Sequence, residues 1–223
     1  MTRNITVARG NGSATITLDR PAKKNALSIA LRDEVSDTLD ALVRDPTLKC
    51  VVFTGAGDVF SAGFDLGEFG VGTPGFQERL WASSDRFHHA VLRFPLPTIA
   101  AVNGPALAGG FDLAVLCDIR VAATTARFAH PEQRFGDVVY GPLHDLVGGA
   151  VARDLCFTGR SIDADEALRL GIVSSVVARE ELDAEVTRLV GAITAAPRET
   201  LVRTKAKAVA RSAIPEDART LDL

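Results

Sequence analysis

The sequence predicts an α/β fold in which short buried strands alternate with helices, followed by a mostly helical C-terminal third. Two apolar runs, residues 50–53 and 99–102, have the length and composition of buried strands, and each precedes a Gly-rich loop and a helical pattern. From residue 145 onward the pattern is helical, apart from one apolar segment at 172–177. We therefore expect an α/β core over residues 1–177 and a C-terminal helical region over 178–223.

The N-terminal elements have clear local signals. Apolar and polar side chains alternate on both sides of Gly10-Asn11-Gly12, which predicts a β-hairpin over residues 5–18. A helix should follow with Ser28 as its N-cap, because apolar residues then recur on one face. These apolar residues are Leu31, Val35, Leu39 and Leu42. A strand over 49–54 should then end in a Gly-rich loop that reaches Asp58.

The middle of the chain contains a short internal repeat. The tetrapeptide Gly-Phe-Asp-Leu occurs at 63–66 and again at 110–113, each time after an apolar strand and a Gly-containing turn. This predicts two similar strand–loop–helix units, with chance similarity in an Ala/Gly-rich chain as the alternative. The other expected elements are an irregular stretch at 67–75, helices at 76–92 and 108–117, and strands at 98–103, 119–122 and 127–129.

Composition excludes several classes of function. The net charge of −3 and the pI of about 5.8 provide no basic face for nucleic acid. No apolar run is suited to a signal peptide or to membrane insertion, so we expect a cytoplasmic protein. The three cysteines, Cys50, Cys117 and Cys156, are too far apart for a disulfide framework or a CxxC metal site.

Three common catalytic motifs are incomplete. The run Gly55 to Gly57 lacks the third glycine of a dinucleotide-binding fingerprint. A nucleophile elbow around Ser61 would need glycine where Val59 stands. His88 and His89 are adjacent on a predicted helix and so point to different faces, and no other metal-ligand spacing is present. We therefore expect neither a nicotinamide cofactor nor a bound metal.

Two Gly-rich loops remain, Ala62-Gly63-Phe64 and Ala108-Gly109-Gly110. Each follows an apolar strand and precedes a predicted helix, a place where backbone N–H groups lack partners. Two such groups brought together form an oxyanion hole, which holds the negative charge of an acyl transition state. The alternative is that both loops are merely tight turns.

The chain resembles the enoyl-CoA hydratase/isomerase (crotonase) superfamily. The stretches that carry the resemblance occur in the family's order, at residues 18–27, 51–69, 97–123, 127–136 and 157–177. The resemblance implies a spiral of repeated ββα units whose C-terminal helices make trimer contacts, in a homotrimer or a dimer of trimers. It also implies an acyl-CoA thioester as substrate, with no cofactor beyond the coenzyme A that the substrate carries.

The resemblance assigns the catalytic groups position by position. The oxyanion-hole donors would be the amides of Phe64 and Gly109, and the acid/base pair would be Asp112 and Glu132. Glu132 follows Pro131 in an apolar stretch, where partial desolvation should raise its pKa and suit proton transfer near neutral pH. Hydratases of the family generally carry Glu at the position of Asp112, which is one methylene shorter. Capping of a helix start is therefore an alternative role for Asp112.

Substrate-binding residues are implied in the same way. They are Lys24, Ala26, Ala62, Gly63, Asp65, Leu66, Gly110 and Tyr140. A solvated turn is the alternative for the basic pair Lys23-Lys24. Residues 137–145 depart from the family because they lack its Gly-rich turn beside the acyl pocket. This departure adds Asp137 and His144, besides Tyr140, as polar candidates for substrate contact.

These residues favour an acyl-CoA enzyme of the hydratase/isomerase type, which holds a thioester enolate in a backbone oxyanion hole beside a carboxylate acid/base. A decarboxylase or hydrolase acting on the same enolate stays open, since these reactions need fewer carboxylates than hydration does. A non-catalytic acyl-CoA binding protein on the same fold is the main alternative. A serine hydrolase built on Ser61 is a third, although it lacks an obvious histidine partner.

Overall fold

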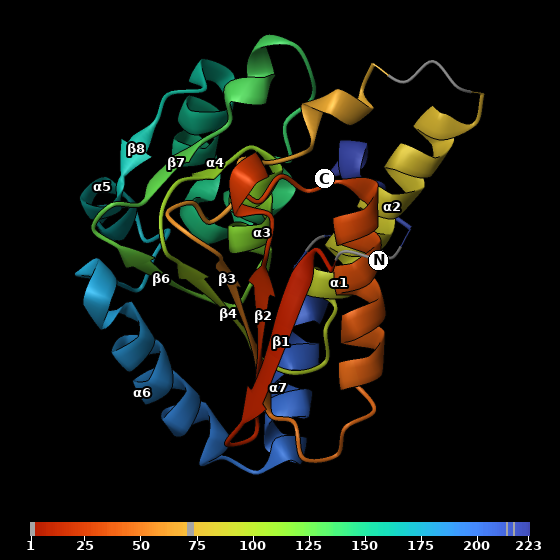
Figure 1. Ribbon diagram of the computed structural model, residues 1–223. Helices are drawn as coiled ribbons and strands as arrows, with labels where there is room; N and C mark the ends of the chain where they lie inside the picture. The colour runs from red at the N-terminus through yellow and green to blue at the C-terminus, as the bar shows by residue number, and fades with distance from the viewer. Residues whose placement is uncertain (1–2, 71–73, 213, 216) are drawn as a thin grey trace.

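The computed structural model describes residues 3–70, 74–212, 214–215 and 217–223. Its centre is a six-stranded sheet in the order β1-β2-β3-β4-β6-β9 (Figure 1). The predicted hairpin pairs β1 with β2 in antiparallel register, and every later pair in this sheet is parallel. The strands are β1 (Ile5–Gly10), β2 (Ser13–Leu18), β3 (Cys50–Gly55), β4 (Thr98–Val102), β6 (Ile119–Ala123) and β9 (Ser175–Val177).

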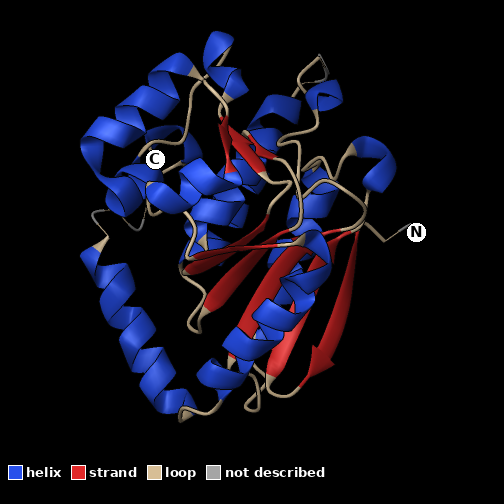
Figure 2. Ribbon diagram, turned by 90° about the vertical axis from the view of Figure 1, so that its left-hand side faces the viewer, coloured by secondary structure: helices blue, strands red, loops and turns tan. Residues whose placement is uncertain are grey.

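A smaller sheet, in the order β5-β7-β8, lies beyond one end of the large one (Figure 2). Its strands are β5 (Ala106–Leu107), β7 (Arg127–Ala129) and β8 (Ile162–Asp163). β5 runs almost directly into helix α3 (Gly109–Leu116), and β7 runs into a short 3₁₀ turn, Pro131–Arg134. Because β5 and β7 pair in parallel, the start of α3 and the start of this turn lie side by side.

The inner strands β3 and β4 of the large sheet are buried on both faces, which explains their uninterrupted apolar runs. On β3, Val51 and Phe53 face the larger core beneath α1 (Ile29–Leu42) and α2 (Phe76–Leu92). The alternate residues Cys50 and Val52 face a second core, which α6 (Leu182–Thr194) covers from the other side (Figure 1). Thus α6, from the predicted C-terminal region, is part of the packing of the sheet.

Local sequence signals place the first helices correctly. Ser28 is the N-cap of α1, since its Oγ accepts a hydrogen bond of 3.3 Å from the Leu31 amide, and the predicted apolar face is buried. Helix α2 spans the predicted residues 76–92. The expected irregular stretch at 67–75 includes residues 71–73, which lie outside the described residues.

The two Gly-Phe-Asp-Leu copies fold differently, which corrects the prediction of two similar units. The second copy opens α3, whereas the first leads only into a 3₁₀ turn, Leu66–Glu68. The cause is Asp65, whose side chain accepts from the Gly67 amide at 3.2 Å and pairs with Arg20 at 2.9 Å. Both contacts fix an extended residue where a helix would have continued.

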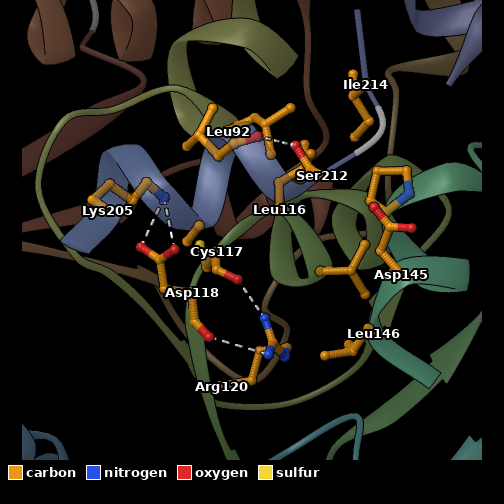
Figure 3. Close-up of a pocket in the computed structure, with 14 residues that line it drawn as sticks. Leu92, Leu116, Cys117, Asp118, Arg120, Asp145, Leu146, Lys205, Ser212 and Ile214 are labelled. Carbon is orange, nitrogen blue, oxygen red and sulfur yellow. Dashed lines mark hydrogen bonds and ion pairs between the residues drawn. The ribbon is translucent and has the colours of Figure 1, made fainter. Parts of the chain in front are cut away.

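The remaining helices close the other side of the larger core. They are α4 (Gly141–Thr158), α5 (Ala164–Arg169) and α7 (Arg198–Arg211). An ion pair with one buried partner fixes α7 to the sheet: the Nζ of the buried Lys205 lies 2.7 and 2.8 Å from the two carboxylate oxygens of the more exposed Asp118 (Figure 3). Asp118 also accepts a hydrogen bond from the Thr98 amide. Among the described helices, none has the length and apolar character needed to cross a bilayer.

Candidate active site

A cavity of about 350 Å³ opens where the two Gly-rich loops, α2 and the turn after β7 meet. Seven of the sequence-predicted site residues line it: Ala62, Phe64, Leu66, Gly109, Asp112, Glu132 and Asp137. The rest of the wall is largely apolar and includes Phe69, Trp81, Phe135, Val138 and Val139. Asp137 and Thr220 add polar groups to this wall. A mostly apolar cavity with a few convergent polar groups is typical of a small-molecule site.

The two Gly-rich loops lie against each other. A Cβ at Gly63 would lie 2.7 Å from the Ala108 Cβ and 3.1 Å from the Gly109 nitrogen, so only glycine permits this approach. Ser61, just before Gly63, makes an isolated parallel bridge with Ala106 of β5. Segments more than forty residues apart in the chain therefore share one wall of the cavity.

Two amides in these loops are unpaired. Within the described part of the chain, neither the Phe64 nor the Gly109 N–H donates to an acceptor. Ala108, just before Gly109, has φ 50° and ψ −130°, a conformation rarely adopted by residues other than glycine. Holding such a conformation costs about 1–3 kcal/mol, and it persists only where the surrounding structure enforces it. Both amides belong to residues that line the cavity, as an oxyanion hole requires.

Three titratable side chains converge beside these amides. Asp112 lies one turn into α3, and Glu132 lies in the 3₁₀ turn after β7. His130 lies between them: its Nδ1 is 2.9 Å from Glu132 Oε1 and 3.7 Å from Asp112 Oδ1. The imidazole is completely buried and stacks on Phe111, with the ring centroids 4.8 Å apart. Sequence reasoning missed His130, although its place immediately before Pro131-Glu132 was a signal.

Burial acts in opposite directions on the pKa values of Asp112 and His130. Desolvation, opposed by His130 and reinforced by the charge of Glu132, raises the pKa of Asp112 to about 8. Burial acts to lower the pKa of His130, but the hydrogen bond to Glu132, the charge of Asp112 when it is ionised and the charge of Glu132 raise it above its usual value. Near neutral pH, Asp112 therefore holds its proton. Helix capping is excluded as its role, because Ala108 is the N-cap of α3 and no side chain caps it.

The raised pKa of Asp112 has a consequence for stability. The folded protein keeps a proton on Asp112 that the unfolded chain releases above about pH 4, so this stability is present at low pH and is lost as pH rises through about 8. We expect Asp112→Asn to melt a few degrees above the parent at pH 8–9 and to reduce this pH dependence. Thermal melts from pH 5 to 9 measure it; parallel curves for both proteins would show that Asp112 ionises freely.

Other predicted binding residues lie outside this cavity. Lys24, Ala26, Gly63, Asp65, Gly110 and Tyr140 are not among its lining residues. Gly110 packs against Ser61, where a Cβ would lie 2.4 Å from the Ser61 carbonyl oxygen. The ring of Tyr140 lies beside His144, with the centroids 5.4 Å apart, and of the three polar candidates in that segment only Asp137 lines the cavity. Asp65 holds Arg20, as described above.

Asn25 connects the loops around the site. Its side chain is fully buried; Oδ1 accepts from the Arg20 amide at 3.0 Å, and Nδ2 donates to the carbonyls of Ala56 and Val59 at 2.9 and 2.7 Å. Lys24 and Asn25 both have positive φ, near 50°, which turns the chain sharply here. The Lys24 carbonyl accepts from the Ala62 amide at 3.0 Å, so this turn supports the first Gly-rich loop.

The side chains of Asp112, His130 and Glu132 also have the spacing of a possible cation site, with one ligand atom from each within 4.8 Å of the others. A metal-bound histidine, however, almost always donates its second ring N–H to a partner. His130 Nε2 has no such partner among the described residues, and Nδ1 is already bonded to Glu132. The arrangement therefore suits proton transfer better than metal binding.

Comparison with known proteins identifies the family of the chain. The family model for enoyl-CoA hydratase/isomerase matches residues 8–223. A probable enoyl-CoA hydratase (echA8) of Mycobacterium bovis is 39% identical over 183 residues, 80% of this chain and 70% of its own length. A crotonyl-CoA hydratase of Syntrophomonas wolfei is 37% identical over 196 residues, 85% of this chain and 75% of its own.

A solved structure agrees with these relatives. The crystal structure of an enoyl-CoA hydratase from Mycobacterium smegmatis superposes with a TM-score of 0.89 at 32% identity, covering 97% of this chain and 86% of that one. The predicted crotonase-like fold is thereby confirmed. The chain belongs to the enoyl-CoA hydratase/isomerase family.

Proposed function

We propose that the protein adds water across the double bond of a 2-enoyl-CoA thioester. One observation carries the proposal: two unpaired amides and two carboxyl groups line the same cavity. One of these carboxyls, Asp112, is neutral near pH 7, and the other, Glu132, accepts a hydrogen bond from His130. An acid and a base with different protonation states are what hydration needs.

The reaction would use these groups as follows. The thioester oxygen accepts hydrogen bonds from the amides of Phe64 and Gly109. Glu132 takes a proton from water as the water oxygen bonds to C3, and the π electrons move towards the thioester to form an enolate. Asp112 then gives its proton to C2 while the enolate returns to the thioester. The sum is the addition of one water, and return of the proton from Glu132 to Asp112 restores the site.

Isomerisation is the second candidate, because moving a double bond needs only one carboxylate as a proton shuttle. The buried Asp112 favours hydration over this alternative. Burying a carboxyl group without a hydrogen-bond partner is costly, and Asp112 Oδ1 has none among the described residues. A group kept at that cost beside Glu132 fits a reaction that uses two proton-transferring groups.

Incubation with a panel of acyl-CoA thioesters, followed by mass spectrometry, tests the proposal. Hydration of a 2-enoyl-CoA should add the mass of one water, with the product bearing its hydroxyl on C3. A rearranged double bond without a mass change would indicate an isomerase. Release of a free acid or of CO₂ would indicate a hydrolase or a decarboxylase, and the hydration mechanism would be withdrawn.

Binding of CoA gives an independent prediction. If the Gly-rich loops hold a thioester, acetyl-CoA at 100 times its Kd should stabilise the folded protein by about 2.7 kcal/mol through mass action. For a chain of this size, that corresponds to a rise in Tm of about 5–10 °C. Differential scanning fluorimetry measures the shift, with adenosine triphosphate as a control for nonspecific binding of phosphates. No shift at millimolar acetyl-CoA would count against acyl-CoA as the ligand.

A further inference from the structure

His130 has no part in the proton transfers proposed above, yet it contacts the group that performs one of them. Its side chain is fully buried on the small sheet side of the cavity and packs flat on Phe111. The nearest polar atoms to its Nδ1 are Glu132 Oε1 at 2.9 Å and Asp112 Oδ1 at 3.7 Å. A residue needed only to fill this space would not have to be polar.

The contact fixes which ring nitrogen carries the hydrogen. A carboxylate oxygen has lone pairs and no hydrogen to give, so at 2.9 Å Nδ1 must be the donor. In the neutral ring, Nε2 is then a bare acceptor, and it is buried with no partner among the described residues. Among the described residues, no interaction of Nε2 therefore draws the ring away from Glu132.

The same contact makes the two oxygens of Glu132 different. Oε1 is occupied by the imidazole, whereas Oε2 is buried and has no hydrogen-bond partner in the described part of the chain. The Glu132 side chain keeps 14% of its surface exposed, and the residue lines the cavity. Of the two oxygens, Oε2 is therefore the one that no described group of the protein engages, and it is left for proton exchange.

We propose that His130 is a positioning residue, whose Nδ1–H holds Glu132 Oε1 and leaves Oε2 for proton transfer. This inference rests on the proposed function, because it gives Glu132 a proton to move. Hydrogen bonds to an ionised carboxylate are stronger than those between neutral groups, so the contact holds the Glu132 side chain firmly in place. A displacement of about 1 Å at such a group can cost 10²-fold in rate.

Three other ionisable side chains lie around His130. Asp112 faces it from α3 and Glu132 from the 3₁₀ turn. The thiol of Cys156 on α4 feels the charges of both carboxylates, and burial together with these charges raises its pKa to about 12. The thiol therefore stays neutral between pH 5 and 9, and it does not compete with the carboxyl groups for the imidazole.

Two substitutions separate the hydrogen bond from the ring. His130→Phe keeps an aromatic ring to stack on Phe111 but has no donor, while His130→Asn keeps an N–H near the position of Nδ1. We expect His130→Phe to lower kcat by about 10²-fold, with KM changed less than about threefold. We expect His130→Asn to stay within about 10-fold of the parent.

Several results would overturn this role. They are a kcat in His130→Phe within about threefold of the parent, or an equal loss in both variants. Should His130→Phe fail to fold by circular dichroism, the kcat of His130→Asn decides alone: a loss of about 10²-fold with a parent-like fold would show that an N–H at this place does not suffice.

A measurement without turnover separates this inference from the proposed function. In ¹⁵N-labelled protein, the resonances lost in His130→Phe identify the His130 ring, and their shifts report which nitrogen is protonated. We expect the proton on Nδ1. A ring protonated only on Nε2 would overturn the inference even in an active hydratase. A parent enzyme that hydrates no enoyl-CoA would instead overturn the proposed function.

Discussion

Glu132→Gln is expected to lower kcat by about 10²–10⁴-fold, the usual contribution of a general acid or base, while CoA still binds. The amide oxygen of glutamine can accept from His130 Nδ1 as the carboxylate does at 2.9 Å, so the side chain should keep its place and lose only its ability to carry a proton. Steady-state hydration kinetics and the acetyl-CoA melting shift measure the two effects separately.

Two control variants sharpen this result. Glu199→Gln makes the same chemical change on α7 at a side chain that is 88% exposed, and it should leave the kinetics unchanged. Asp112→Asn should lose activity to a similar degree if both carboxyls move protons in hydration. Loss in Glu132→Gln with near-normal turnover in Asp112→Asn would favour isomerisation by one base. Full activity in Glu132→Gln would exclude Glu132 from the chemistry.

Gly109→Pro is expected to reduce turnover by about 10²–10³-fold, because proline removes the amide hydrogen assigned to the oxyanion hole. The first position of a helix tolerates proline, and Gly109 opens α3. Proline also restricts the backbone angles of the residue before it, however, and Ala108 already has rare backbone angles. Circular dichroism and melting curves must therefore match those of the parent before the kinetics are interpreted.

Gly109→Ala is the matched control for the added side chain. Its Cβ would lie 2.8 Å from Cδ1 of the Phe64 ring, so it disturbs the packing of the loops but keeps the N–H. A far larger loss in Gly109→Pro than in Gly109→Ala identifies the amide as a donor. Equal losses would mean that crowding against Phe64 is the cause, and the donor would have to be sought elsewhere.

Local signals in the sequence predicted most of the elements. The hairpin, the Ser28 cap and the bounds of α2 depend on alternation, capping and helical periodicity, all of which act within a few residues. The placing of Asp112 and Glu132 in one cavity needed more, since it depends on the parallel pairing of β5 and β7. The resemblance to a family predicted that the two carboxyl groups lie together, which hydrophobic periodicity could not predict.

What the sequence did not predict depends on contacts between distant residues. The ion pair of Asp65 joins residues 45 positions apart and ends the first Gly-Phe-Asp-Leu copy in a short turn. The role of Asn25 depends on carbonyls more than 30 positions away. His130 resembles an ordinary strand-end residue until burial brings it to Glu132 and Asp112. No periodic pattern in the sequence indicates these contacts between distant residues.

The backbone of Ala108 has a consequence for protein engineering. Because its φ of 50° is unfavourable for alanine, a search for heat-resistant variants would be drawn to glycine at this position, where the same conformation is nearly free. The gain would come with a freer backbone just before the Gly109 amide. Selection by melting temperature alone would thus reward a change that loosens the loop carrying the proposed oxyanion-hole donor, so residue 108 is best kept fixed in such a search.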